Sequence, residues 1–338
     1  MHNTPNSCDV AIIGAGPVGL FAVFECGMLE MGCHLFDALP AAGGQCSALY
    51  PEKPIYDIPG YPQIGAGELV DRLSEQAAPF APTFHLGHPV AGLGDDEGGF
   101  LVENLAGAQV TARAVMIAAG AGAFGPNRPP LAGIEEFEAK SIFYLVRRRE
   151  DFRGRRVVIA GGGDSAVDWA LSLADVAERV IVVHRRARFR AAPQSAARLQ
   201  ALADAGRIEL VIPYQLQALE GAAGQLSAVI VADLAGGSRR LDADCLLPFF
   251  GLATDLGPLA QWGLTLDHNR ITVDPATCAT SRPGIFAIGD IAVYPGKLKL
   301  ILSGFAEAAL AAHAIHPLVH PGDALHFEYS TTKGVPGR

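Results

Sequence analysis

Short apolar runs that alternate with glycine-rich turns dominate the hydrophobic pattern of this chain. Val10-Ala11-Ile12-Ile13 is such a run, and its length and continuity are typical of a parallel strand buried on both faces. The turn Gly14-x-Gly16-x-x-Gly19 follows and leads into an apolar segment that predicts a helix to about Met31. A second run, His34-Leu35-Phe36, predicts the next strand and ends on Asp37.

The same plan occurs again at an offset of 147 residues. Val157-Val158-Ile159-Ala160 precedes the turn Gly161-Gly162-Gly163-Asp164-Ser165-Ala166, from which a helix is predicted through Leu173. The run Val180-Ile181-Val182-Val183 then predicts a strand that ends on His184. Two copies of strand, glycine turn, helix and strand predict an α/β protein with two Rossmann-like dinucleotide-binding domains.

The glycines of such a turn act on the nucleotide through the backbone. The first permits the tight turn, the second lets a phosphate approach the backbone, and the third position must be small so that helix and strand can pack. The N-terminus of the helix faces the pyrophosphate. We therefore expect one nucleotide on Gly14, Gly16 and Gly19, and the other on Gly161, Gly162, Gly163, Asp164 and Ser165.

The residue that ends the second strand distinguishes the two sites. Asp37 lies 18 residues beyond the third glycine, close to the spacing of a carboxylate that binds ribose hydroxyls, so the first site suits a nucleotide with a free 2′-OH. The aligned residue of the second copy is His184, which Arg185, Arg186 and Arg190 follow. Because guanidinium groups bind a 2′-phosphate that an acid would repel, the second site predicts NADP rather than NAD. The alternative is that His184-Arg185-Arg186 is only a solvated strand end.

A further apolar strand is expected near the end of the chain, in residues 280–290. It runs into Gly289-Asp290, and a helix is predicted after it from about Ser303 to Ile315. At such a strand end Asp290 would lie beside the ribityl chain of a flavin. The helix N-terminus would face the flavin pyrimidine edge, where negative charge develops on reduction. This arrangement indicates FAD at the first site, although Gly289-Asp290 taken alone could equally be a turn.

Composition limits the class of protein. The 338 residues are 50% hydrophobic and 18% charged, which suits two domains with sizeable cores. No apolar run approaches the roughly 18 residues that a membrane span needs, and the start of the chain lacks a basic and apolar leader, so we expect a soluble cytoplasmic protein. The six cysteines show neither a Cys-x-x-Cys pair nor zinc-site spacing, which predicts reduced, mostly buried thiols and no metal.

The charge is distributed unevenly. A net charge of −9 argues against nucleic acid as the partner, because duplex binding depends on Lys and Arg that neutralise phosphates. The segment from Lys140 to Arg198, however, contains thirteen of the 26 basic residues and six acidic ones, a net charge of +7. An acidic protein with one basic segment can attract an anionic partner there.

Four motifs together resemble the thioredoxin reductase family in order and spacing. They are Gly14-x-Gly16-x-x-Gly19, Ala118-Ala119-Gly120, Gly161-Gly162-Gly163-Asp164-Ser165-Ala166 and Gly284-Ile285-Phe286-Ala287-Ile288-Gly289-Asp290. The likeness covers nearly the whole chain. It implies an FAD domain formed by both chain ends, residues 1–117 and 248–338, with an NADPH domain of residues 118–247 inserted between them. It also suggests a homodimer.

The chain departs from thioredoxin reductases at their redox-active Cys-x-x-Cys, because the segment Ser141-Ile142-Phe143-Tyr144-Leu145-Val146-Arg147 contains no cysteine. Without a dithiol, disulfide exchange by that route is excluded. The subgroup that lacks the pair, keeps Asp168-Trp169 after the second glycine turn and adds a C-terminal tail is the ferredoxin–NADP reductase type, which this chain resembles. The resemblance implies ferredoxin or flavodoxin as the electron-transfer partner.

The resemblance also implies which residues surround the flavin. Asp37 would bind the adenosine ribose, and Tyr50 and the tail residue Tyr329 would stack on opposite faces of the ring. Further contacts with FAD would come from Gln45, Val90, Phe124, Asp290 and Thr331. Alternatively, Tyr50 is a turn residue before Pro51, and Tyr329 occupies a tail position whose residue type varies. Cys46 adjoins this region but is unpaired, so no redox role is predicted for it.

The expected reaction needs no acid or base. Hydride transfer from nicotinamide C4 to flavin N5 depends on proximity and stacking, and the reduced flavin can release its electrons singly to an iron–sulfur carrier. Two alternatives stay open: an NADPH-dependent flavoprotein reductase with another acceptor, and a flavin redox sensor without turnover. Five arginines precede the second glycine turn: Arg147, Arg148, Arg149, Arg153 and Arg155. They are candidates for contact with an acidic ferredoxin. The alternative is that they belong to a solvated linker or helix face.

Overall fold

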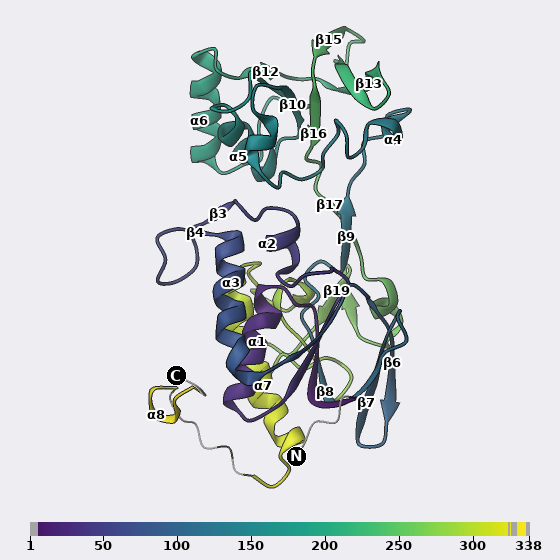
Figure 1. Ribbon diagram of the computed structural model, residues 1–338, viewed down its shortest axis with the longest axis vertical. Helices are drawn as coiled ribbons and strands as arrows, with labels where there is room; N and C mark the ends of the chain where they lie inside the picture. Colours follow the sequence, from purple (N-terminus) through teal and green to yellow (C-terminus); the bar gives the residue numbers. More distant parts are fainter. Residues whose placement is uncertain (1–5, 324, 326–329, 336–338) are drawn as a thin grey trace. The chain divides into compact units, whose positions relative to one another are not determined.

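Two compact units make up the chain, and both chain ends belong to the first of them. The structure, a computed structural model, describes residues 6–323, 325 and 330–335, apart from the side chains of residues 123–126, 252–255, 330 and 333. Unit 1 comprises Met1–Phe124 and Thr254–Arg338, and unit 2 comprises Gly125–Ala253 (Figure 1). Two strands that pair with each other, β9 (Ala123–Pro126) and β17 (Leu252–Asp255), carry the chain from one unit to the other. These boundaries lie a few residues beyond the expected ones.

A seven-stranded sheet organises unit 1. Its order is β5-β2-β1-β8-β7-β6, and β20 pairs with β8. The pairs β5–β2, β2–β1, β1–β8 and β8–β20 are parallel, whereas β6, β7 and β8 pair antiparallel. The strands are β1 (Ser7–Ile13), β2 (Cys33–Asp37), β5 (Thr83–Leu86), β6 (Val90–Asp96), β7 (Gly99–Asn104), β8 (Gln109–Ile117) and β20 (Ile285–Ala287). The residues that follow β1, β2, β8 and β20 therefore meet at one edge, where ligands bind in open parallel sheets.

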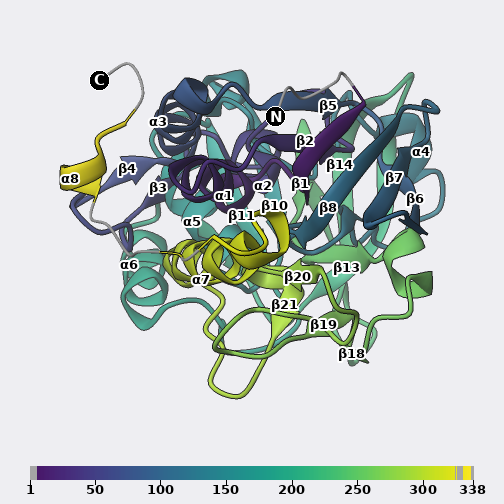
Figure 2. The same ribbon diagram turned by 90° about the horizontal axis from the view of Figure 1, so that it is seen from below.

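Three helices cover one face of this sheet: α1 (Pro17–Met28), α3 (Ala66–Ala77) and α7 (Ile301–Val319), of which α1 and α7 lie side by side (Figure 2). Their apolar sides form one core with alternate residues of the central strands, such as Val10, Ile12 and Met116. Residues of the opposite register, such as Ala11 and Ile117, form a second core with Trp262. Because the central strands are buried on both faces, they appear in the sequence as continuous apolar runs.

A four-stranded parallel sheet, in the order β12-β11-β10-β16, is the centre of unit 2. Its strands are β10 (Arg156–Ala160), β11 (Arg179–Val183), β12 (Glu209–Val211) and β16 (Cys245–Pro248). The helices α5 (Asp164–Leu173) and α6 (Pro193–Asp204) pack on one core. The short helix α4 (Ile134–Phe137) and an antiparallel sheet enclose another, with β13 (Gln215–Ala222), β14 (Gln225–Ala232) and β15 (Ser238–Asp242).

The remaining elements are short. Unit 1 also contains α2 (Gly44–Ala48), α8 (Ser330–Lys333), β3 (Pro54–Ile55), β4 (Ile64–Gly65), β18 (Leu266–Asp267), β19 (Arg270–Thr272) and β21 (Ala292–Val293). Single 3₁₀ turns lie at Ala78–Phe80, Arg149–Phe152, Gly257–Gln261 and Gly289–Ile291.

The helix ends differ somewhat from the predicted ones. The first helix ends at Met28 rather than near Met31, and α7 extends beyond the predicted 303–315 at both ends. All six cysteines are free and buried, as expected. Over the part of the chain that the structure describes, no helix combines the length and apolar character that a membrane crossing requires. The same residues contain no cluster of three or more His, Cys, Asp or Glu side chains suited to a metal ion.

Candidate functional site

A cavity of about 330 Å³ opens at the carboxyl edge of the unit 1 sheet. Its walls come from the turn after β1, the end of β2, α2 and Tyr50, the residues after β8, and the turn that contains Gly289 and Asp290. Segments far apart in the sequence thus converge on one hollow. Of the residues predicted to contact FAD, seven line it: Gly14, Gly16, Asp37, Gln45, Tyr50, Val90 and Asp290.

The three glycines of the first turn have different neighbours. Gly14 has φ +113°, and a Cβ there would lie 2.3 Å from the carbonyl oxygen of Ala118. A Cβ on Gly19 would lie 1.9 Å from the carbonyl oxygen of Gly14, so α1 can begin this close to the strand only without a side chain. At Gly16, by contrast, the nearest atom is the Cα of Gly44 at 3.9 Å. The middle glycine therefore leaves its backbone accessible from the cavity.

Asp37 is tied to this turn. One carboxylate oxygen accepts a hydrogen bond from the backbone N–H of Ala15 at 2.7 Å, and the other accepts one from that of Leu39 at 2.9 Å. Burial raises the pKa of Asp37, and the two backbone hydrogen bonds oppose that rise. Because an ionised carboxylate can accept about four hydrogen bonds, acceptor capacity is left for the hydroxyls of a ribose.

Tyr50 and Cys46 line the same cavity, and their side chains form a hydrogen bond with each other. Burial raises the pKa of Tyr50 above its usual value, and it raises that of Cys46 to about 11. Both groups are therefore neutral at physiological pH. A neutral phenol can stack on an aromatic ligand without adding charge, and a protonated thiol is a poor nucleophile.

Three residues predicted near the flavin are not among the described side chains that line the cavity. Phe124 lies in β9, but its side chain is outside the described residues, and so is Tyr329. Thr331 lies in α8 and is exposed, whereas the cavity walls come from other segments.

The second glycine turn has the same geometry in unit 2. A Cβ on Gly161, whose φ is +155°, would lie 2.6 Å from the carbonyl oxygen of Phe249, whereas a Cβ on Gly163 would meet no protein atom within 4 Å. Helix α5 begins directly after it with Asp164 and Ser165, both exposed. The first glycine is thus a packing requirement, and the open side of Gly163 at the helix N-terminus suits a phosphate.

The residues after β11 divide into a buried one and exposed ones. His184 is only 7% exposed, and burial lowers its pKa. Arg185, Arg186 and Arg190 are exposed and follow it within one short loop. The predicted 2′-phosphate ligands therefore project from the strand end beside the glycine turn, except for His184.

Comparison with known proteins places these two sites in a family. The sequence profile of the pyridine nucleotide-disulphide oxidoreductases matches residues 8–314. The chain belongs to this family. It is 67% identical to the ferredoxin–NADP reductase of Paramagnetospirillum magneticum over 329 residues, which are 97% of this chain and 98% of the relative. It is 64% identical to that of Rhodospirillum rubrum over 99% of both chains.

Solved structures of thioredoxin reductases agree with the architecture. Thioredoxin reductase from Lactococcus lactis superposes with a TM-score of 0.78 at 25% identity, covering 93% of this chain and 99% of the other. That from T. acidophilum gives a TM-score of 0.79 at 24% identity over 92% of this chain and 98% of the other, which shows the fold alone. The predicted fold class, two Rossmann-like domains, and the predicted family resemblance are confirmed.

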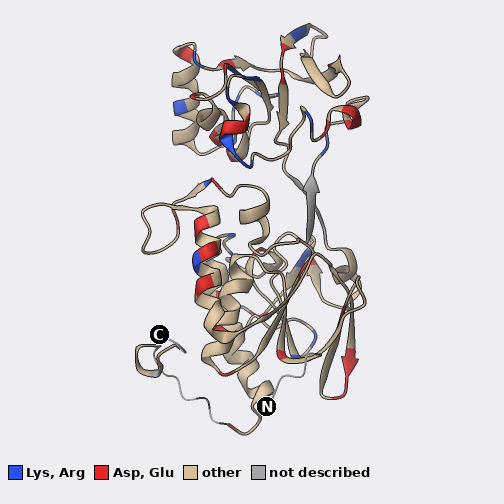
Figure 3. Cartoon of the chain, in the orientation of Figure 1, with Lys and Arg blue, Asp and Glu red and all other residues tan. Residues whose placement is uncertain are grey.

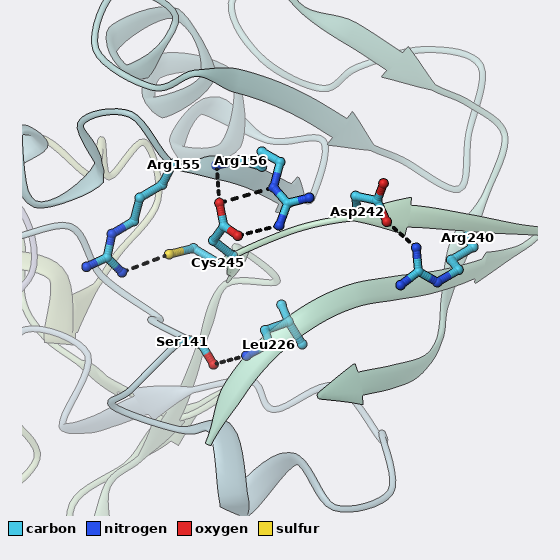
Figure 4. A network of polar contacts seen from close by, with 8 residues as sticks. Ser141, Arg155, Arg156, Leu226, Arg240, Asp242 and Cys245 are labelled. Carbon is cyan, nitrogen blue, oxygen red and sulfur yellow. Dashed lines mark hydrogen bonds and ion pairs between the residues drawn. The ribbon is translucent and has the colours of Figure 1, made fainter. Parts of the chain in front are cut away.

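The segment where thioredoxin reductases carry their dithiol has structural contacts in this family member. The Ser141 hydroxyl donates to the carbonyl of Gly224 at 2.8 Å. It also accepts from the N–H of Leu226 at 3.2 Å (Figure 4). The Tyr144 hydroxyl donates to Glu138 at 2.6 Å. These side chains join the segment to the rest of unit 2, and none of them is a thiol.

A buried charge network behind the cavity was not predicted. The Glu307 carboxylate, on α7, accepts from the N–H of Gly289 and the hydroxyl of Tyr294, both at 2.7 Å, and forms an ion pair with Lys297. The Lys297 and Glu307 side chains are each only 3% exposed. Since Gly289 precedes Asp290, this network holds the turn that forms one wall of the cavity. The sequence does contain a signal, namely one charged residue in an otherwise apolar helix face.

Proposed function

We propose that this protein is an FAD-containing oxidoreductase that transfers electrons between NADPH and ferredoxin or flavodoxin. Bound FAD supplies the redox chemistry, because it can take a hydride from NADPH and return electrons one at a time. The observation that carries the proposal is the pair of unlike nucleotide sites, one ending on a carboxylate and the other on arginines. They occur in a chain highly similar to ferredoxin–NADP reductases.

The first site fits the dinucleotide half of FAD. Gly14 and Gly19 form the close turn, and the open backbone at Gly16 lies where a pyrophosphate can approach. Asp37 binds the adenosine ribose, because its carboxylate can accept further hydrogen bonds besides the two from the backbone. Gln45, Tyr50, Val90 and Asp290 line the cavity and contact the rest of the cofactor. We extend the FAD contacts to Phe124, Tyr329 and Thr331 on the family resemblance.

The second site binds NADPH through Gly161, Gly163 and the N-terminus of α5, with Asp164 and Ser165 in its first turn. Arg185, Arg186 and Arg190 bind the 2′-phosphate. The domains are those of the resemblance, residues 1–117 with 248–338 for FAD and residues 118–247 for NADPH. Their task is to bring the two rings together, so no side chain acts as an acid or base. We also propose that the protein is a homodimer, on the family resemblance, and that it works in the cytoplasm.

A turnover assay tests this function. The purified protein should be yellow, acid should release FAD rather than FMN, and NADPH should reduce cytochrome c much faster when ferredoxin is added. Rapid NADPH oxidation that is indifferent to ferredoxin or flavodoxin would instead favour a reductase with another acceptor. Bound flavin without NADPH turnover would favour a redox sensor.

A further inference from the structure

His184 is enclosed by the loop that follows it. Its ring stacks on Phe189 with a centroid distance of 5.3 Å and an angle of 22° between the planes. Its Nε2 lies 3.2 Å from the carbonyl oxygen of Arg188. A carbonyl oxygen only accepts hydrogen bonds, so Nε2 carries the hydrogen in this contact. The imidazole is thus engaged by the loop itself and has little surface left for a ligand.

The other side of the ring rests on the glycine turn. A Cβ on Gly162 would lie 2.2 Å from Cε1 of His184, so the ring occupies the space of a side chain at position 162. A Cβ on the adjacent Gly163 would meet nothing within 4 Å. The two neighbouring glycines therefore have separate roles: Gly162 makes room for the His184 ring, and Gly163 leaves the backbone open to the nucleotide.

Two further hydrogen bonds fasten the same loop to the turn. The carbonyl oxygen of Gly162 accepts from the backbone N–H of Arg190 at 2.7 Å. One carboxylate oxygen of Asp164 accepts from the N–H of Ala192 at 2.9 Å. The loop is thus held beside the turn at three points, and Arg185 and Arg186 extend into solvent from its first residues.

From this geometry we propose that His184 is a positioning residue for NADPH specificity, which holds the arginine loop 185–190 against the glycine turn and does not itself bind the 2′-phosphate. The inference rests on the proposed function, in which NADPH occupies this site. It gives His184 a role other than the one its sequence position predicted. Burial lowers the pKa of His184, the hydrogen bond to the Arg188 carbonyl opposes this, and the positive charges of Arg190, Arg186 and Arg185 lower the pKa further. The net shift is downward, so the ring is neutral at physiological pH.

The decisive variant is His184→Phe, which keeps an aromatic ring against Phe189 and Gly162 but loses the hydrogen bond to Arg188. We expect the KM for NADPH to rise about tenfold, while kcat and the efficiency with NADH stay unchanged, with ferricyanide as acceptor. Between about pH 6 and pH 8 the profiles of parent and variant should be parallel. A difference that disappears as the pH rises would mean that a protonated His184 binds the phosphate, and would overturn the inference.

Neighbouring positions supply matched controls. Gly162→Ala displaces the ring and should raise the KM for NADPH selectively, whereas Gly163→Ala should impair NADPH and NADH alike. Asp164→Ala releases the far end of the loop and should raise the KM for NADPH, and Asp164→Asn, which keeps an acceptor oxygen, should restore it. Because Asp164 is exposed, this pair tests the loop even if His184→Phe does not fold.

Equal efficiency with NADPH and NADH in the parent would refute the proposed function itself. A parent preference for NADPH that His184→Phe and Gly162→Ala both retain would refute only the role of His184.

Discussion

The two glycine turns share a plan, but their third positions differ: unit 1 leaves no room for a side chain there, and unit 2 holds an alanine. In unit 1 a Cβ on Gly19 would lie 1.9 Å from the carbonyl oxygen of Gly14. In unit 2 the aligned position is Ala166, whose own Cβ lies 3.0 Å from the place of a Cβ on Gly161. The third position is therefore glycine in unit 1, where a methyl group would overlap the carbonyl oxygen of the first glycine. Elsewhere alanine fits, and the turn keeps its form.

A second comparison concerns the end of the second strand. Asp37 accepts a hydrogen bond from the N–H of Ala15, and His184 packs its ring on Gly162, the residue aligned with Ala15. Both residues thus join the strand end to the same position of the turn. The position has one structural role in both copies, and under the proposed function the residue type together with its neighbours selects the nucleotide.

The largest expected effect comes from making the first turn resemble the second. Gly19→Ala should abolish FAD retention, because the new methyl group overlaps the Gly14 carbonyl and pushes α1 off the strand. The ratio of flavin to protein absorbance after purification measures this. The reciprocal change Ala166→Gly should cost only about 1 kcal/mol and leave both cofactor sites working. Full flavin content in Gly19→Ala would show that the contrast between the turns has no consequence.

The next effect concerns the charges behind the first site. Glu307→Gln should leave the Lys297 charge buried without its partner, at a cost of about 3–5 kcal/mol, and should release FAD at lower denaturant concentration. Adding Lys297→Met should recover much of the loss. The exposed pair of Arg72 and Glu68 on α3 is the control, since removing it should change little. If Glu307→Gln behaved like that control, the network would have no part in holding the Gly289 turn.

A smaller loss is expected from the arginines of the second site. Arg185→Ala or Arg186→Ala should remove a charge-assisted contact worth about 1.5–3 kcal/mol and raise the KM for NADPH tenfold or more, with little change for NADH. Arg240→Ala removes the same charge from an exposed strand of unit 2 and should leave the KM for NADPH and the KM for NADH unchanged. A parent enzyme that used NADH and NADPH equally would contradict the assignment of these residues.

Local rules account for what could be predicted from the sequence. Continuous apolar runs and the glycine spacing predicted β1, β10 and both turns, because buried parallel strands and close helix packing restrict the residues at those positions. The contacts of Glu307 with Lys297 and Gly289 depend on how α7 returns to the sheet, which no local pattern encodes.

The role of His184 was hidden for the same reason. Its spacing from the turn matched that of Asp37, but its burial depends on the loop through Phe189, whose fold the sequence pattern did not show. Contacts of His184 with its own loop and with Gly162, which the motif spacing does not encode, thus decide whether this residue is open to a ligand.

The smallest expected effect concerns the basic segment before the second turn. In unit 2 the acidic and basic positions are interspersed along the chain (Figure 3). Arg148 pairs with Asp151 at 2.6 Å and Arg153 with Glu150 at 2.7 Å, so part of the +7 charge is compensated locally. Arg155 donates to the Cys245 sulfur at 3.4 Å. The charge left for an acidic ferredoxin is therefore less than the sequence count indicates.

Surface charges of this kind act mainly on the rate of association, and salt screens them over about 8 Å. Replacing Arg147, Arg148 and Arg149 together with Ala should lower ferredoxin turnover a few-fold at low salt and leave NADPH-to-ferricyanide turnover nearly unchanged. In the parent, added salt should reproduce that selective loss. A matched variant that removes three exposed arginines outside the basic segment but in unit 2, Arg207, Arg239 and Arg240, controls for net charge. If both triple variants lose ferredoxin turnover equally, overall charge rather than this segment guides the carrier, and if neither does, the acceptor docks elsewhere.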